Sequence, residues 1–288
     1  MSGLRTRLIT AIFFVGSMIA GIFAHPLSMT VLFVLLPGLC LYEFFGLTLL
    51  PSRDDEAAEG SLLVKSRRWL AIAYGVSPSA LLAVHYWVYP FPSGDVLFLS
   101  GILFLFLSGF FLLELFASGK DAFAKVAYIL LGSIYIGIPF AMVIHLGISG
   151  DQFRPWVVFG IILLIWANDT FAYLLGSWIG KTKLIPRVSP KKTWEGTLSG
   201  VLVTILASWL YYLLFGHLVL SQWLVIGGII AVLGTIGDLI ESMLKRSFKA
   251  KDSGGLLPGH GGFLDRFDSF IFVIPFVWVY LMAVGGLS

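Results

Sequence analysis

Charged side chains are scarce in this sequence of 288 residues. Only 12% of the residues are Asp, Glu, Lys or Arg, whereas 58% are hydrophobic and the mean hydropathy is +0.94. Because soluble globular domains contain roughly 25% charged residues, a water-soluble chain of this composition would lack a polar surface. The composition excludes a soluble globular protein and predicts that most side chains face lipid or neighbouring helices.

Cysteine is nearly absent as well. The single cysteine, Cys40, lies within an apolar run, so an intramolecular disulfide is excluded, and no Cys–His spacing typical of a zinc site occurs. We interpret Cys40 as a small buried apolar residue. No internal repeat is evident either, which argues against a transporter built from inverted repeats.

Long apolar runs, in contrast, follow one another along the whole chain. About 20 apolar residues span a bilayer, and runs of roughly this length lie at Leu8–Ala24, Ser28–Leu49, Trp69–Tyr89, Asp95–Phe116, Ala124–Leu146, Pro155–Ile179, Gly196–Phe215, Trp223–Leu244 and Phe270–Gly286. The runs are continuous rather than alternating, which argues against barrel strands. We therefore predict an all-α fold, a polytopic transmembrane bundle of about nine helices. Residues 1–150 would form helices 1–5 and residues 151–288 helices 6–9 of one continuous membrane domain.

The first run has a second interpretation. Arg5 and Arg7 precede it, as basic residues precede the apolar part of a signal peptide. The run is long, however, and the residues before His25 form a poor cleavage site. We therefore count this run as the first membrane helix and keep the signal peptide as the alternative.

Basic residues alternate with the apolar runs. If the N-terminus and the even-numbered connections share one side, that side holds all but one of the 19 basic residues, the exception being Arg154. Since positive residues stay cytoplasmic, we predict a multi-pass protein of the cell membrane with its N-terminus inside and its C-terminus outside. The segment Pro51–Arg68 is expected to be a solvated cytoplasmic loop.

Two carboxylates lie inside apolar runs, where they are costly unless they face a cavity and have partners. Asp169 and Asp238 both fall within roughly 10–15 Å of the predicted cytoplasmic boundary, at 1.5 Å per residue. Oxygen ligands at similar depth beneath basic loops suggest a metal site, and Asn168 and Glu241 could add further contacts. Helix-packing polar residues or buried ion pairs are the alternative.

The connections Gly180–Glu195 and Lys245–Asp268 together hold just over half of the 19 basic residues and are rich in glycine, serine, threonine and proline. Lysine and arginine neutralise phosphate, and glycine lets backbone N–H groups approach it. The two connections therefore suggest a phosphate site. Ordinary positive-inside charge would produce the same excess of basic residues.

The first of these connections ends in a compact polar motif. Pro190 is expected to fix a turn there, and Lys191 and Lys192 follow it. The hydroxyls of Ser189 and Thr193 flank the lysines immediately before the next apolar run. A helix N-terminus beside lysines is a site for anions, so the motif predicts an anion-binding helix start.

The second connection contains the only histidine predicted on the cytoplasmic side. This residue, His260, stands before Gly261 and Gly262, and its setting favours a functional role. Further along, Asp265 and Asp268 are three residues apart. On a helix they would share a face and could close a metal site.

These segments resemble the signature of the phosphatidate cytidylyltransferases, also called CDP-diglyceride synthases. No departure from that signature occurs across Ser242-Met243-Leu244-Lys245-Arg246, Lys251-Asp252, His260-Gly261-Gly262 and Asp265-Arg266-Phe267-Asp268. The other two motifs of the family resemble Asn168-Asp169 with Ala172-Tyr173, and Ser189-Pro190-Lys191-Lys192-Thr193-Trp194-Glu195-Gly196. The resemblance is strongest from about Trp156 to Asp268, and the first 150 residues match only as generic membrane helices.

The resemblance implies a specific reaction, in which CTP and phosphatidic acid give CDP-diacylglycerol and pyrophosphate in phospholipid biosynthesis, at the cytoplasmic side of the membrane. It implies Mg²⁺ as cofactor, with a second metal ion left open, membrane lipid and no nucleic acid as partners, and a homodimer left open. The metal ligands it implies are Asp169, Asp238, Asp265 and Asp268. The catalytic residues it implies are Lys192, Lys245, Arg246, His260 and Arg266. The nucleotide-binding residues it implies are Ser189, Lys191, Thr193, Lys251, Gly261 and Gly262.

Two alternative functions stay open at this point. A membrane transferase of the polyprenyl-phosphate type also combines intramembrane aspartates, Mg²⁺ and a cytoplasmic nucleotide. A cation or phosphate transporter would likewise place carboxylates near the middle of the membrane. A transporter needs access from both sides, however, whereas every candidate residue lies in the predicted inner half.

Overall fold

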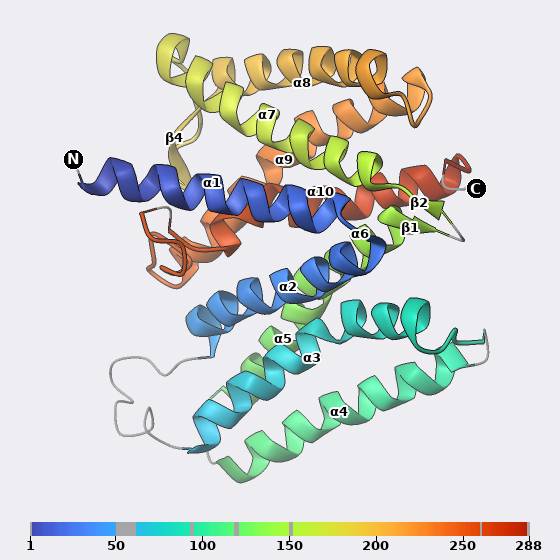
Figure 1. Ribbon diagram of the computed structural model, residues 1–288. Helices are drawn as coiled ribbons and strands as arrows, with labels where there is room; N and C mark the ends of the chain where they lie inside the picture. The colour runs from blue at the N-terminus through green and yellow to red at the C-terminus, as the bar shows by residue number, and fades with distance from the viewer. Residues whose placement is uncertain are drawn as a thin grey trace. The chain divides into compact units, whose positions relative to one another are not determined.

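A computed structural model of the chain describes residues 2–49, 62–92, 95–117, 121–149, 152–259 and 261–286 (Figure 1). Helices account for most of these residues, as the all-α prediction requires. They are α1 (Ser2–Phe23), α2 (Pro26–Thr48), α3 (Leu62–Trp87), α4 (Asp95–Ala117), α5 (Ala122–Gly132), α6 (Ile138–Gly147), α7 (Pro155–Ile179), α8 (Trp194–Phe215), α9 (Leu220–Ser247) and α10 (Leu264–Ala283). The π-helical turn η2 (Ser133–Gly137) joins α5 to α6, so these three elements form one continuous helix.

Within the described ranges, eight helical segments are long and apolar enough to cross a membrane. The chain is therefore a multi-pass membrane protein. Helix α3 is not among the eight, because Ser77, Pro78, Ser79 and His85 interrupt its apolar sequence. The third predicted span, Trp69–Tyr89, is helical as far as Trp87, but its crossing of the membrane stays a prediction, as does the orientation of the two termini.

The helices assemble into two compact units. Unit 1 comprises Met1–Thr10, Thr30–Ile144 and Asp252–Leu264. Unit 2 comprises Ala11–Met29, His145–Lys251 and Asp265–Ser288. Each unit thus joins segments that are distant in sequence, and the loop before α10 belongs with helices from the first half of the chain. The division of one continuous membrane domain near residue 150 stays a prediction.

The start of α3, in unit 1, corrects one expectation. Pro51–Arg68 is expected from the sequence to be a solvated loop, yet α3 begins at Leu62 and Arg67 is only 4% exposed. The Arg67 guanidinium lies 2.8 Å from the Glu114 carboxylate of α4. The expectation is wrong for Arg67 because a buried partner compensates its charge. Residues 51–61 of the predicted loop lie outside the described residues.

Helices α7, α8 and α9 form the centre of unit 2, and α7 and α8 run close together (Figure 1). They approach each other closely at the start of α8. A Cβ on Gly196 would lie 2.6 Å from the carbonyl oxygen of Ala172 and 2.7 Å from the Cα of Gly176. Only glycine allows this backbone contact, which fixes the first turn of α8 against the end of α7.

Two short hairpins supplement the helices. Strands β1 (Ile148–Ser149) and β2 (Gln152–Phe153) form one, and β3 (Lys183–Ile185) and β4 (Ser189–Thr193) form the other, both antiparallel. The predicted turn at Pro190 is wrong, because Pro190 lies within β4. Both strands of a two-stranded hairpin are edges, where the missing N–H of proline costs no ladder hydrogen bond.

The predicted connection Lys245–Asp268 is shorter in the structure. Helix α9 continues to Ser247 and α10 begins at Leu264. Lys245 and Asp265 therefore lie on helices. The helical spacing of Asp265 and Asp268 expected from the sequence is confirmed.

Candidate active site

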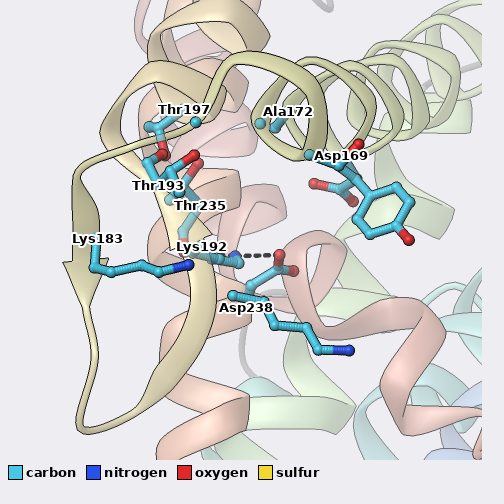
Figure 2. Close-up of a pocket in the computed structure, with 13 residues that line it drawn as sticks. Asp169, Ala172, Lys183, Lys192, Thr193, Thr197, Thr235 and Asp238 are labelled. Carbon is cyan, nitrogen blue, oxygen red and sulfur yellow. Dashed lines mark hydrogen bonds and ion pairs between the residues drawn. The ribbon is translucent and has the colours of Figure 1, made fainter.

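A cavity of about 440 Å³ lies in unit 2, between α7, the β3–β4 hairpin, α8 and α9 (Figure 2). Its polar lining includes three lysines, two aspartates and three threonines. These are Lys183, Lys191, Lys192, Asp169, Asp238, Thr193, Thr197 and Thr235. Such a density of charge among membrane-length helices is costly unless a ligand or paired charges compensate it.

The hairpin supplies the positive charge of the cavity. Lys183 lies on β3, opposite Thr193 of β4, while Lys191 and Lys192 lie on β4 itself. Figure 2 shows the Lys183 side chain reaching from its strand into the cavity towards Lys192. Three ammonium groups on one short hairpin form a site suited to a polyanion such as a nucleoside triphosphate.

Lys192 connects the hairpin to α9. Its Nζ forms an ion pair with Asp238 (Figure 2) and lies 3.4 Å from the carbonyl oxygen of Thr235. The side chains of Lys192 and Asp238 are 25% and 21% exposed. The pair therefore borders the cavity, where an incoming phosphate or cation can contact either partner.

Ser269 of α10 links the two aspartates. Its Oγ lies 2.6 Å from Asp238 Oδ1, 3.0 Å from the carbonyl oxygen of Gly234 and 3.4 Å from Asp169 Oδ1. A hydroxyl donates only one proton, so Ser269 cannot satisfy all three acceptors at once. The carboxylates of Asp169 and Asp238 consequently keep lone pairs for a further ligand.

Asn168 fixes the position of Asp169 from within α7. Asn168 is 1% exposed, and its Nδ2 lies 3.4 Å from Asp169 Oδ1. Thr204 Oγ1 of α8 lies 3.3 Å from Asn168 Oδ1 and 2.8 Å from the carbonyl oxygen of Gly200. The amide of Asn168 thus lies between the aspartate and α8, and its N–H group helps to orient the Asp169 carboxylate.

The fit of this site to Mg²⁺ follows from its donor atoms. Asp169 and Asp238 present carboxylate oxygens, and Asp268 lies within electrostatic reach of both. Among the residues that the structure describes, no group of three or more His, Cys, Asp or Glu side chains is arranged to hold a metal ion by itself. Mg²⁺ is usually bound by one or two carboxylates together with substrate phosphates and water. The two aspartates fit that mode of binding better than a cage made of protein ligands alone.

A second charged cluster in unit 2 is less exposed. Lys245 forms an ion pair with Glu241, one turn earlier on α9, and its Nζ lies 2.6 Å from Asp265 Oδ1. The side chains of Lys245, Glu241 and Asp265 are 14%, 2% and 12% exposed. In this structure two carboxylates surround Lys245, so its predicted contact with phosphate, and the predicted contact of Asp265 with metal, stay predictions.

The structure brings together five of the predicted site residues, since Asp169, Asp238, Lys191, Lys192 and Thr193 line one cavity. Seven other predicted site residues described in unit 2 are not among its lining residues, namely Ser189, Lys245, Arg246, Lys251, Asp265, Arg266 and Asp268. Gly261 and Gly262 belong to unit 1. The prediction for His260 falls outside the described residues.

Comparison with known sequences places this chain in a family. The model of the cytidylyltransferase family matches residues 5–284, which is nearly the whole chain. The chain belongs to that family. The resemblance inferred from three short motifs thus extends to the first 150 residues, which the motifs alone match only as generic membrane helices.

Bacterial proteins named phosphatidate cytidylyltransferase are similar to this cytidylyltransferase-family chain. The protein of Bacillus subtilis (strain 168) is 41% identical over 160 residues, which cover 55% of this chain and 59% of the relative. The protein of Staphylococcus saprophyticus is 38% identical over 170 residues, covering 58% and 64%. The protein of Staphylococcus aureus (strain COL) is 38% identical over 170 residues, covering 58% and 63%. The chain thus spans less than two thirds of the length of these relatives.

Three residues of the site were not expected from the sequence of this family member. Lys183 lies in a basic connection but outside any motif, and Ser269 directly follows the signature. Glu195, inside a motif, accepts hydrogen bonds from the backbone N–H groups of Lys181 and Thr182, each at 3.1 Å. Glu195 thereby holds the first residues of the hairpin segment at the start of α8. The only sequence signal for Ser269 was its position next to a motif. The only signal for Lys183 was its place in a connection rich in basic residues.

Proposed function

We propose that this protein transfers the cytidylyl group of CTP to phosphatidic acid and releases pyrophosphate. The observation that carries the proposal is the cavity of unit 2, in which Asp169 and Asp238 lie with Lys183, Lys191 and Lys192. Membership of the cytidylyltransferase family and the names of the similar bacterial proteins support it. The product that remains in the membrane would be CDP-diacylglycerol.

The lysines of the hairpin would bind the triphosphate. Lys183 and Lys191 are exposed, so phosphate oxygens can replace water around their ammonium groups without breaking a protein contact. Lys192 would share its charge between Asp238 and a phosphate. Fixed cations favour this reaction because both substrates are polyanions, and their repulsion is the main obstacle to bringing them together.

The nucleophile requires no strong base. A phosphate oxygen of phosphatidic acid is already anionic at neutral pH, so attack on the α-phosphorus of CTP forms the new P–O bond and breaks the bond to the β-phosphate bridging oxygen. Pyrophosphate leaves with the negative charge. The residues of the site therefore need to position and screen charge, and none has to remove a proton from the lipid phosphate.

Asp169 and Asp238 are the residues that would hold Mg²⁺, completed by phosphate oxygens and water. When bound, Mg²⁺ would neutralise charge on the transferring phosphoryl group and the leaving pyrophosphate. Asn168 and Ser269 would hold the two carboxylates at the position that the ion requires. Asp265 and Asp268 remain further candidate ligands.

The lipid would reach the cavity laterally from the bilayer, between membrane helices. Tyr173 of α7 lines the cavity and is 71% exposed, and the nearby Trp178 is 82% exposed. Large apolar side chains exposed on a membrane helix face acyl chains. The phosphate of the lipid would then enter the cavity while its tails stay in the bilayer. The charge distribution along the sequence supports a cytoplasmic location for this site.

The test is a matrix of nucleotides and lipids with the purified full-length protein in detergent and Mg²⁺. CTP with phosphatidic acid should give a nucleotide-containing lipid. Diacylglycerol should not replace phosphatidic acid, because its neutral hydroxyl would need a general base. If UTP with a polyprenyl phosphate gave a lipid product and CTP with phosphatidic acid gave none, the proposal would be wrong and a polyprenyl-phosphate transferase would take its place.

A further inference from the structure

A buried glutamate in unit 1 lies outside the candidate active site. Glu43 of α2 is 4% exposed, within a helix apolar enough to cross a membrane. A carboxylate in such a position costs several kcal/mol unless hydrogen bonds or opposite charges compensate it. The sequence offers no nearby partner for it in α2, so its partners must come from elsewhere in the fold.

Those partners come from the glycine-rich loop that precedes α10. Glu43 Oε2 accepts a hydrogen bond from the Ser253 hydroxyl and another from the backbone N–H of Leu264, both at 3.0 Å. Glu43 Oε1 accepts from the backbone N–H of Leu256 at 3.5 Å. One carboxylate therefore joins both ends of the loop to α2, across more than 200 residues of sequence.

Two glycines make this approach possible. A Cβ on Gly254 would lie 2.4 Å from Glu43 Oε1, and a Cβ on Gly262 would lie 2.3 Å from Glu43 Oε2. A Cβ on Gly255, in contrast, would meet nothing within 4 Å. The loop is thus shaped closely around the carboxylate at Gly254 and Gly262, while Gly255 faces open space.

The bond to Leu264 has a second consequence. Leu264 is the first residue of α10, so its N–H is one of the groups that a helix start leaves without an intrahelical partner. A carboxylate there satisfies the N–H and interacts favourably with the helix dipole. Asp268 and Ser269 follow one turn later on the same helix, so the place where α10 begins determines where these two residues lie.

We propose that Glu43 is a positioning residue for the reaction. It anchors the loop from Asp252 to Phe263 and the start of α10 to α2, and in this way sets the position of Asp268 and Ser269. Both oxygens of Glu43 are occupied by the loop, so Glu43 acts through α10 and not on the substrate. The reaction itself is that of the proposed function, on which this inference rests.

The test compares Glu43→Gln with the wild-type chain. Glutamine keeps the size of the side chain but removes its charge and one acceptor. We expect kcat to fall about 10-fold or more, since a shift of about 1 Å far from the chemistry can cost up to 10²-fold. The KM for CTP should change less than about 3-fold, because Lys183 and Lys191, which would bind the triphosphate, lie on the hairpin and not on α10. Glu43→Asp should recover part of the lost kcat.

Two matched controls separate positioning from general stability. Glu114→Gln changes another buried glutamate of unit 1, which pairs with Arg67 and not with the loop. It should lower thermal stability while kcat per folded molecule stays unchanged. Gly254→Ala should lower kcat as Glu43→Gln does, whereas Gly255→Ala should behave as wild type. Equal effects of the two alanines would overturn the inference.

Hydrogen exchange provides a readout that needs no activity. Glu43→Gln should increase amide exchange at Leu256 and Leu264 relative to wild type, and Glu114→Gln should not. Unchanged exchange and unchanged kcat in Glu43→Gln would overturn the positioning role. Increased exchange in a protein whose wild type transfers no cytidylyl group would support the anchor and overturn only the proposed function.

Discussion

Two clusters of lysine and carboxylate each include side chains of α9, and they differ in their surroundings. Lys192 and Asp238 border the cavity, with side chains 25% and 21% exposed. Lys245 is 14% exposed and lies between Glu241 and Asp265, which are 2% and 12% exposed. The first cluster borders a cavity that has room for a ligand, whereas in the second two carboxylates surround one ammonium group. The difference suggests that Lys192 is available to a ligand, whereas Lys245 stabilises the packing of α9 against α10.

The largest effect on turnover is expected from Asp238→Asn, which keeps the shape of the side chain and removes its charge. Loss of one group that stabilises transition-state charge usually costs 10²-fold or more, so the rate at saturating CTP and Mg²⁺ should fall at least about 100-fold. The thermal midpoint should change little, because Asp238 borders the cavity. Initial rates and thermal unfolding in detergent measure both.

The control for this variant is Asp121→Asn, which changes an exposed aspartate before α5 that makes no side-chain cap. It should leave the rate unchanged. A rate for Asp238→Asn within about threefold of wild type would mean that Asp238 stabilises no charge in the reaction.

A different kind of loss is expected from Lys245→Met. Removing one partner of a buried ion pair leaves the other charge uncompensated, which costs about 3–5 kcal/mol. Lys245→Met should therefore lower the thermal midpoint and the folded yield strongly. Arg246→Met, at the exposed neighbouring position, should be stable.

The combined variant Lys245→Met, Glu241→Gln and Asp265→Asn sharpens this result. It removes both uncompensated charges and should recover much of the lost stability. If Lys245→Met instead unfolded as wild type does and lost only its affinity for CTP, Lys245 would belong with Lys192 as a phosphate contact, as the sequence motif implies.

The smallest effect is expected from Lys183→Ala. Lys183 is an exposed lysine that lines the cavity without an ion-pair partner among the described contacts. One charge-assisted contact to phosphate contributes about 1.5 kcal/mol, so the KM for CTP should rise about 10-fold with a small change in kcat. Arg187→Ala, in the turn of the same hairpin, should leave KM as it is. Equal changes in the KM for CTP in both variants would show that Lys183 makes no specific contact with phosphate and that only the total positive charge of the hairpin matters.

The helices could be predicted because a continuous apolar run in a bilayer must satisfy its backbone hydrogen bonds within the segment, and an α-helix does this. Asp169 and Asp238 could be predicted to face a cavity, because a carboxylate within such a run is costly unless it faces a cavity and has partners. Their role in a reaction stays a prediction. The hairpin was missed because Pro190 favours a turn by itself, while its place on an edge strand depends on the partner strand. Arg67 was misplaced because its partner, Glu114, lies on another helix.

Glu43 shows the same limit more clearly. A single glutamate in an apolar run carries no motif, and its partners Ser253 and Leu264 are more than 200 residues away. The distinction between Lys192 and Lys245 likewise depends on which carboxylates surround each ammonium group. Sequence shows where charge is present, and the fold decides which charges compensate one another.

The most direct test of the account follows the two ends of the CTP triphosphate. Wild-type protein is incubated with phosphatidic acid, Mg²⁺ and CTP labelled at either the α- or the γ-phosphate, and the lipid fraction is extracted. The account predicts α-label in lipid and γ-label only in pyrophosphate, because attack at the α-phosphorus expels the outer two phosphates. Asp238→Asn should give neither. Appearance of γ-label in lipid would contradict the account and identify a CTP-dependent lipid kinase.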